Sequence, residues 1–393
     1  MSLTIFIPKE TAQAERRVAA TPETVKKLIA QGCAVRVEKG AGVESSIPDA
    51  LYTDAGATII DTAADGFSQA DIVLKVQAPT DDEAAKMKKG ALLACIMAPY
   101  QNANLIAALA KQGVDVFSME LVPRITRAQA MDVLSSQSNL AGYKAVLDAT
   151  EHFNRAFPMM MTAAGTVPPA RVFIMGVGVA GLQAIATAKR LGAIVSATDV
   201  RAATKEQVQS LGASFVMVED DESKAAETAG GYAKEMSDAY KAKQAALIAE
   251  TIAKQDIVIT TALIPGRKAP TLVTAAMVKT MKPGSVIVDL AVEQGGNCEL
   301  SKVGEVVDVD GVKIIGHRNV PSRLSANASA LYAKNLLNLL GLVLNKDGAK
   351  DIPWDDDIIK GVALTRDGAL IHPQFGGPAP APKEQPTEKA AAQ

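Results

Sequence analysis

The chain has 393 residues, with 41 Lys and Arg against 43 Asp and Glu and a formal net charge of −2. This length exceeds one ordinary domain, and a hydrophobic content of 48% is enough to fill two cores. The balanced charge gives no basic excess that would indicate a nucleic-acid partner. Cys33, Cys95 and Cys298 show neither metal-ligand spacing nor a disulfide framework. We interpret them as small core residues in a reducing compartment.

Nothing in the sequence indicates export or membrane insertion. The N-terminus enters a strand-like run without the basic and apolar segments of a signal peptide. The longest apolar run, near residues 336–344, is interrupted by Asn338 and falls well short of the roughly 20 residues of a membrane helix. We therefore expect a soluble chain.

Strands alternate with helices from the start of the chain. A helix is expected from Thr21, a good N-cap, followed by Pro22 in the first turn. The expected strands are residues 3–7, 34–38, 58–60, 72–76, 91–97 and 114–118. This order predicts a mostly parallel sheet with helices on both faces. No glycine fingerprint occurs in this half, so we expect a Rossmann-like domain without its own dinucleotide.

A dense polar run, residues 123–139, follows the last of these strands. It can be a solvated loop that leads into a helix. Charged, amide and hydroxyl groups at this density, at the carboxyl end of a strand, also suit a polar ligand. A helix to about residue 155 then crosses between domains. Residues 157–169 are apolar with breakers, and we expect their methionines to pack.

The strongest signal runs from residue 171 to Asp199. A strand enters the turn Gly176-Val177-Gly178-Val179-Ala180-Gly181, a helix follows, and a second strand ends in the acid. The three glycines permit a tight turn, close approach of a pyrophosphate, and helix–strand packing. Asp199, 18 residues beyond Gly181, can accept a hydrogen bond from a ribose 2′-OH and would repel a 2′-phosphate. We therefore predict NAD(H) rather than NADP(H).

Further strands are expected at residues 214–219, 256–261, 285–290 and 312–316. Arg201 is interpreted as a cap near the adenine or as a solvated residue. The polar insertion at 220–243 predicts a mobile lid that includes Gly231 and Tyr232, and a disordered surface loop stays an alternative. A helix from Ser325 to about Asn345 returns the chain to the first domain, where residues 361–370 add a strand or hairpin.

These segments predict an α/β protein with two Rossmann-like, doubly wound parallel-sheet domains joined by long helices. The first domain comprises residues 1–138 plus 326–375, and the second, NAD(H)-binding domain comprises residues 139–325 with the lid at 220–243. Residues 376–393, rich in proline and charge, are expected to form a disordered tail.

Six runs of sequence together resemble one family. They are Pro8-Lys9-Glu10 with Arg17-Val18-Ala19, and the runs 124–132, 135–142, 176–181, 229–232 and 260–266. They are similar to the soluble NAD(H)-binding component of proton-translocating NAD(P) transhydrogenases, within the alanine dehydrogenase/transhydrogenase family. This component is the first of the two polypeptides that form the alpha subunit where that subunit is split. The similarity covers about residues 1–375.

The resemblance implies direct hydride transfer between NADH and NADP⁺, with NADP(H) held on a partner subunit. Membrane subunits would couple this transfer to proton translocation. The implied partners are the NADP(H)-binding and membrane-spanning subunits, namely the second alpha polypeptide and the beta subunit, together with a second copy of this chain in a homodimer. The implied location is cytoplasmic, on the inner face of the cell membrane through those partners.

The resemblance also assigns residues. Arg124, Gln129 and Asp132 would position the nicotinamide and its ribose, and they are the candidates for catalysis. The remaining implied cofactor-binding residues are Ile125, Thr126, Arg127, Ser135, Ser136, Gly176, Val177, Gly178, Val179, Gly181, Asp199, Val200, Arg201, Gly231, Tyr232, Gln244 and Leu263. No metal ligand is implied.

Two alternatives stay open. An alanine-dehydrogenase-like enzyme would need a proton acceptor and groups for a substrate carboxylate. That family has a histidine after the strand at 91–95, with an arginine and a lysine nearby; here Arg17 and Lys75 are present, but Met97 occupies the histidine position. Hydride exchange between two nicotinamides needs no such base. The second alternative is a non-catalytic NAD(H)-binding module, and His152, His317 and His372 receive no role in any of these interpretations.

Overall fold

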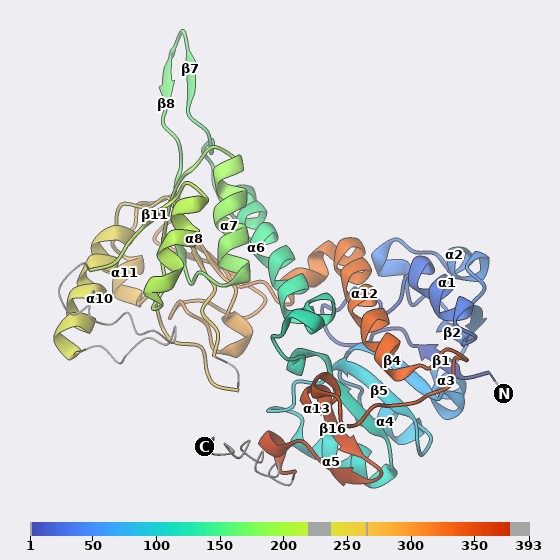
Figure 1. Cartoon of the computed structure of the whole chain (residues 1–393). Coiled ribbons are helices and arrows are strands. Elements are labelled where there is room, and N and C mark those ends of the chain that lie inside the picture. The colour runs from blue at the N-terminus through green and yellow to red at the C-terminus, as the bar shows by residue number, and fades with distance from the viewer. Residues whose placement is uncertain (1, 219–236, 265, 378–393) are drawn as a thin grey trace, which may run out of the picture. The chain divides into compact units, whose positions relative to one another are not determined.

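The computed structural model describes residues 2–218, 237–264 and 266–377, and the chain forms two compact units (Figure 1). Unit 1 comprises Met1–Glu10, Val18–Val133 and the chain from Tyr332 onward, and unit 2 comprises Thr11–Arg17 and Leu134–Leu331. The chain enters unit 2 within helix α6 (Val133–His152) and leaves it within α12 (Ser325–Val343). The sequence did not anticipate that Thr11–Arg17 belongs to unit 2.

Unit 1 is built on an eight-stranded sheet with the order β17-β16-β6-β5-β4-β1-β2-β3. Strands β1 to β6 are parallel, in the order of a Rossmann fold, and the β16–β17 hairpin expected from the sequence joins β6 antiparallel at the edge. The strands are Thr4–Ile7, Ala34–Glu38, Thr58–Ile60, Ile72–Gln77, Leu92–Ile96 and Asp115–Ser118 for β1 to β6, then Ala363–Arg366 and Ala369–Leu370 for β16 and β17. The helices are α1 (Pro22–Ala30), α2 (Asp49–Asp54), α3 (Ala63–Gln69), α4 (Asp81–Lys86), α5 (Ala103–Gln112) and α13 (Asp357–Val362).

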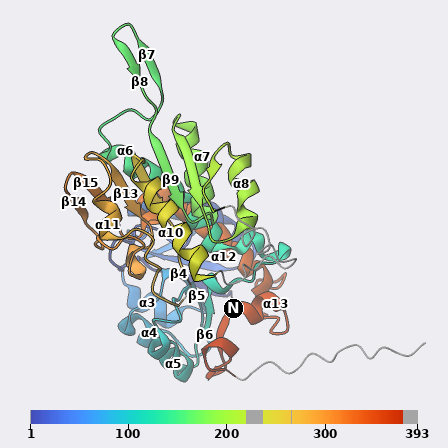
Figure 2. The ribbon, with the colours of Figure 1, turned by 90° about the vertical axis from the view of Figure 1, so that its left-hand side faces the viewer.

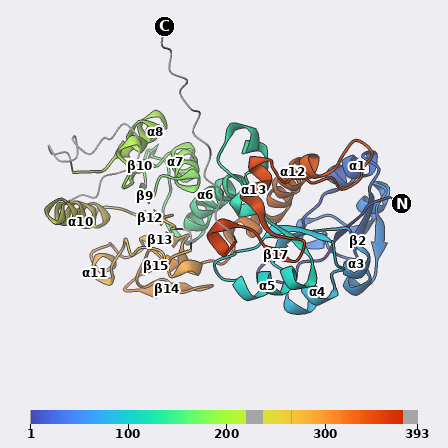
Figure 3. The same cartoon turned by 60° about the horizontal axis from the view of Figure 1, so that its bottom comes forward.

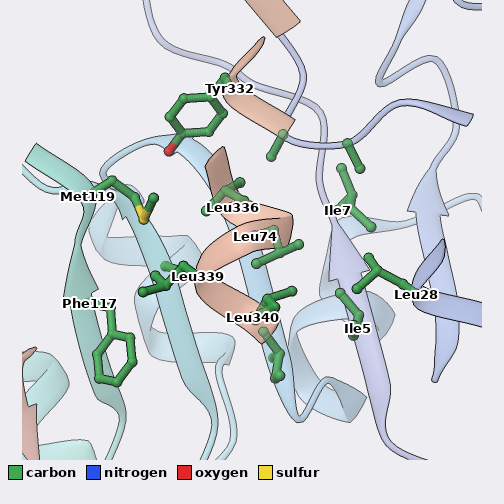
Figure 4. Close-up of a cluster of buried hydrophobic side chains, with 14 of the residues drawn as sticks. Ile5, Ile7, Leu28, Leu74, Phe117, Met119, Tyr332, Leu336, Leu339 and Leu340 are labelled. Carbon is green, nitrogen blue, oxygen red and sulfur yellow. The ribbon is translucent and has the colours of Figure 1, made fainter. Parts of the chain in front are cut away.

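Helix α12 supplies much of the core of unit 1. Its side chains Tyr332, Leu336 and Leu339 are buried against the sheet, together with Ile7 and other apolar residues of the strands (Figure 4). The Tyr332 hydroxyl donates a hydrogen bond of 2.8 Å to the carbonyl of Lys75 in β4. The returning helix is therefore an integral part of this unit.

Unit 2 is built on a seven-stranded sheet with the order β11-β10-β9-β12-β13-β15-β14. Six strands are parallel in the same Rossmann order, and β14, which the sequence did not reveal, pairs antiparallel with β15. The strands β9 to β15 are Arg171–Met175, Ile194–Thr198, Ser214–Phe215, Ile257–Thr260, Val286–Asp289, Val306–Val309 and Val312–Ile315. Helices α6, α7 (Val179–Arg190) and α8 (Lys205–Ser210) cover one face, and α10 (Asp238–Ile252) and α11 (Ala275–Val278) cover the other (Figure 3). Each face has its own apolar core.

A two-stranded hairpin projects from the rest of unit 2 (Figures 1 and 2). It consists of β7 (Met160–Thr162) and β8 (Gly165–Val167), which pair only with each other. Met159, Met160 and Met161 are 59%, 44% and 79% exposed. The expectation that these methionines pack in an interior is therefore wrong within the single chain.

Several further expectations can be compared with the structure. The three cysteines are buried, which confirms them as core residues. Helix α6 ends at His152 rather than near residue 155. Helix α10 begins at Asp238, so the last part of the predicted lid is helical. Residues 219–236, with Gly231 and Tyr232, and the tail from residue 378 lie outside the described residues.

Candidate functional site

The glycine turn of unit 2 is shaped by close backbone contacts. Gly176 ends β9 with a φ of 100°, a conformation that favours glycine. The Thr261 hydroxyl donates a hydrogen bond of 3.0 Å to its carbonyl. A Cβ on Gly181 would lie 1.9 Å from the Gly176 carbonyl oxygen. Helix α7 therefore starts directly against the turn, and a side chain at Gly181 would push it away.

Gly178 differs from the other two glycines. It is the N-cap of α7, with a φ of −82° and a ψ of −166° that any residue can adopt. A Cβ built on it would meet no atom within 4 Å among the described residues. Neither strain nor crowding in this stretch of the chain requires glycine there. The open side of Gly178 lies at a helix N-terminus, where backbone N–H groups and the helix dipole attract anions such as a pyrophosphate.

Asp199 follows β10 and lies beside this turn. Its carboxylate accepts hydrogen bonds from the Val177 N–H (2.7 Å) and the Arg201 N–H (2.9 Å), and it pairs with the Arg201 guanidinium at 2.8 Å. Burial raises the pKa of Asp199, but the hydrogen bonds from Arg201 and Val177 outweigh burial and hold the pKa below its ordinary value. The carboxylate is therefore ionised at neutral pH. Arg201, expected to be a cap or solvated, is its ion-pair partner.

Two further residues organise the carboxyl edge of the unit 2 sheet. Gln244 in α10 accepts a hydrogen bond of 2.8 Å from the Val218 N–H, and its amide nitrogen lies 3.4 Å from the Thr198 hydroxyl. The fully buried Asn297 pairs with both the N–H and the carbonyl of Ala262, at 2.9 Å each. It thereby holds the loop after β12 that carries Leu263, which is 48% exposed.

The sequence did not point to Asn297. The only local signal is the preceding pair Gly295 and Gly296, whose φ angles of 96° and 76° form a tight left-handed turn.

The start of α6 is fixed within unit 2. A Cβ on Gly142 would lie 2.0 Å from the Ala180 carbonyl oxygen, so α6 lies directly against the first turn of α7. Gln137 accepts a hydrogen bond of 2.8 Å from the buried Arg17 and lies 3.2 Å from the Ser136 hydroxyl. Arg17 also pairs with Glu15 at 2.6 Å. These contacts attach the segment Thr11–Arg17 to unit 2.

The polar loop predicted to hold the nicotinamide lies in unit 1, on the 3-10 helix η3 (Thr126–Met131). Ala128 and Met131 are buried and anchor one side of the loop. Asn335 and Asn338 of α12 both donate to the Ala130 carbonyl, at 2.8 and 2.9 Å. The loop is therefore held in one conformation by α12.

This anchoring leaves the other side of the loop exposed. Arg124 and Gln129 point to solvent, and neither side chain makes a hydrogen bond with the described residues. Arg127 instead forms a bidentate pair with Asp356, at 2.7 and 3.0 Å. A role for Arg127 at a nucleotide would require it to leave this partner. Asp132, at the end of η3, is half-buried.

Unit 1 contains a buried lysine beside the position of the missing histidine. Lys75 lies 3.2 Å from a Glu83 oxygen and 3.4 Å from a Glu10 oxygen, and it is 1% exposed. Burial lowers the pKa of Lys75, but the two carboxylates outweigh burial and raise it overall. Met97 is fully buried, and its N–H donates to Glu120 at 3.0 Å.

Only one histidine, His372, lies in unit 1. Its Nδ1 accepts a hydrogen bond from the Gln374 N–H at 3.3 Å, so Nε2 carries the proton and donates to the Gly361 carbonyl at 3.2 Å. Burial lowers its pKa. Both ring nitrogens are engaged in the C-terminal segment, so His372 is not poised as a general base.

The fold and the glycine turn place this chain in the class of two-unit α/β proteins with one Rossmann-type dinucleotide-binding turn. Residues 6–141 match the N-terminal domain and residues 145–373 the C-terminal domain of the family "Alanine dehydrogenase/PNT". The chain belongs to this family and, within it, to the transhydrogenase alpha subunits.

Individual relatives support this placement. The first polypeptide of the split NAD(P) transhydrogenase alpha subunit of Rhodospirillum rubrum is 59% identical over 379 residues, covering 95% of this chain and 99% of the relative. The structure of a transhydrogenase from Sinorhizobium meliloti matches with a TM-score of 0.86 and 55% identity, covering 94% of this chain and all of that one. An alanine dehydrogenase of Methanococcus maripaludis is 32% identical over 368 residues, covering 91% of this chain and 92% of the relative.

Proposed function

We propose that this chain binds NAD(H) in a proton-translocating NAD(P) transhydrogenase and exchanges hydride directly with NADP(H) on a partner subunit. The observation that carries NAD(H) binding is the combination of the unobstructed Gly178 with the ionised Asp199 in the same turn. The first suits a pyrophosphate, and the second suits a ribose diol and disfavours a 2′-phosphate.

The nicotinamide ring supplies the redox chemistry, and the residues of this chain bind and orient it. We assign Arg124, Gln129 and Asp132 to the nicotinamide and its ribose, because the first two are exposed on a loop that α12 holds in place. A group that orients a ring needs such a fixed backbone. Ser135, Ser136, Gln244 and Leu263 are proposed to border the cofactor, as are Gly231 and Tyr232 outside the described residues.

An amino-acid dehydrogenase is the second candidate, and the environment of three residues opposes it. Met97 cannot accept a proton. Lys75 is enclosed with two carboxylates, and the N–H groups of Arg17 are used by Glu15, Gln137 and Asn319. Binding of a substrate carboxylate by either cation would require these buried pairs to break, at considerable cost.

We further propose that the chain works as a homodimer with NADP(H)-binding and membrane-spanning partners at the inner face of the cell membrane. The name of the Rhodospirillum rubrum relative describes one portion of an alpha subunit, which supports the presence of other subunits. The β7–β8 hairpin supports a second copy, because an isolated hairpin with exposed methionines is marginally stable in water. Across residues 2–218, 237–264 and 266–377, no helix combines the length and apolar character that a membrane crossing needs.

The test is deuterium transfer. The chain is mixed with an NADP(H)-binding partner subunit, [4-²H]NADH and NADP⁺, and label in NADPH is measured by mass spectrometry. We expect label transfer only when both proteins are present. Absence of transfer although both nucleotides bind would refute the proposal and favour a non-catalytic binding module. NADH oxidation by pyruvate and ammonia with this chain alone would establish the dehydrogenase instead.

A further inference from the structure

Four N–H groups converge on the Asp199 carboxylate. Two belong to the backbone, at Val177 (2.7 Å) and Arg201 (2.9 Å). The other two belong to the Arg201 side chain, whose Nε and Nη2 lie 2.8 and 3.0 Å from the two carboxylate oxygens. Converging backbone N–H groups combined with a guanidinium form the type of site that binds phosphate in proteins. Here the anion in the site is the chain's own side chain.

The Arg201 guanidinium is the replaceable member of this cluster. The Asp199 side chain is 7% exposed, whereas that of Arg201 is 48% exposed. A carboxylate offers about four acceptor positions, and the four N–H groups use them. A ribose hydroxyl that donates to Asp199 must therefore replace an Arg201 side-chain N–H, because the two backbone groups are fixed. Nη2 is also 3.2 Å from the Val177 carbonyl, which keeps the guanidinium beside the glycine turn.

We propose that Asp199 and Arg201 form one specificity element, in which the Asp199 carboxylate fills a preformed phosphate site and thereby excludes the 2′-phosphate of NADP(H). This inference rests on the proposed binding of NAD(H). Arg201 is thus a latent phosphate ligand, silenced by its neighbour.

The charges of the groups decide the direction of selectivity. A phosphate monoester carries about −1.5 to −2 charges at pH 7. With Asp199 in place, that charge meets a carboxylate, and the single positive charge of Arg201 is already neutralised. With the carboxylate removed, the same guanidinium and two amide N–H groups can bind phosphate oxygens, and arginine suits this bidentate geometry. The low pKa of Asp199 keeps the exclusion in force at neutral pH.

The test measures NADH and NADPH affinities by calorimetry for the full chain and four variants. We expect the unmodified chain to prefer NADH. Asp199→Ala should weaken NADH binding by about 10–100-fold and tighten NADPH binding by about tenfold or more, since hydrogen bonds to charged groups have this strength. Asp199→Ala combined with Arg201→Ala should lose the gain for NADPH. Asp199→Asn should gain little, because the isosteric amide still fills the site.

Asp199→Ser serves as a second cavity-opening variant if the alanine variant does not fold. A folded Ala or Ser variant whose NADPH affinity does not rise would overturn the inference. So would a gain for NADPH that persists without Arg201. If the unmodified chain itself fails to bind NADH, the proposed function fails instead, so the two failures are distinguishable.

Discussion

Gly178→Ala is expected to separate nucleotide binding from folding. The backbone angles at Gly178 suit alanine, and the added methyl group would enter open space among the described residues. Alanine is a poorer N-cap than glycine by up to about 1 kcal/mol. It also restricts the unfolded chain, which stabilises by about 0.4–1 kcal/mol. The two effects nearly cancel, so the thermal midpoint should move by no more than about 4 °C.

The same methyl group would stand where a pyrophosphate approaches the first turn of α7. Moving the phosphates outward loses at least one charge-assisted hydrogen bond, which contributes about 1.5–3 kcal/mol. NADH affinity should therefore fall by at least about tenfold. Calorimetric titration with NADH and a thermal melt of the same sample measure both quantities.

Gly181→Ala is the matched control, because its Cβ would lie 1.9 Å from the Gly176 carbonyl oxygen. This overlap should cost about 1–3 kcal/mol and lower the thermal midpoint clearly. Unchanged NADH affinity in a folded Gly178→Ala protein would refute the pyrophosphate assignment. A large loss of stability in that variant would refute the statement that its surroundings are open.

Three further predictions concern other residues. Gln129→Ala should reduce hydride transfer to NADP⁺ more than NADH affinity, since an orienting group acts on the reacting geometry; equal losses in both would contradict this role. Asn297→Ala leaves Ala262 without its buried partner; each unpaired group costs about 1–3 kcal/mol, so the thermal midpoint and the hydrogen-exchange protection of the Ala262 amide should both fall, and retained protection would argue against this contact. Although burial raises the pKa of Asp199, its hydrogen bonds lower it below the unfolded value of about 3.9. Its stabilisation relative to Asp199→Asn should therefore be present above about pH 4 and disappear as the pH falls through the folded pKa; melts whose difference stays constant from pH 6 to pH 3 would contradict this.

Local patterns allowed much of this molecule to be predicted. The strand, glycine turn, helix and acid between Arg171 and Asp199 lie within 29 residues, and backbone geometry alone fixes their spacing. The Rossmann-like folds of both units followed from the alternation of strands and helices. The position of Met97 was informative for the same reason, because it lies one residue beyond a clearly marked strand.

Long-range contacts and exposed apolar residues could not be predicted in this way. Asn297 holds Ala262 across 35 residues, and Arg17 contacts Gln137 across 120 residues, so no local pattern marks either pair. The run Met159–Met161 has the composition of a core segment, yet it lies on a projecting hairpin. Arg201 was ambiguous because its ion pair with Asp199 depends on the side-chain conformation, which the sequence does not specify.

The route of the chain also sets the order in which it can fold during synthesis. One face of the unit 1 sheet is covered by α12, which begins about 200 residues after the last strand of the first segment of that unit. At about 5–20 residues per second, a ribosome needs roughly 10–40 s to produce that stretch. During this interval the apolar side chains around Ile5 and Ile7 have no α12 to cover them, while unit 2 is being completed. A nascent chain that stalls before Tyr332 should therefore be a client for chaperones that bind exposed apolar strands.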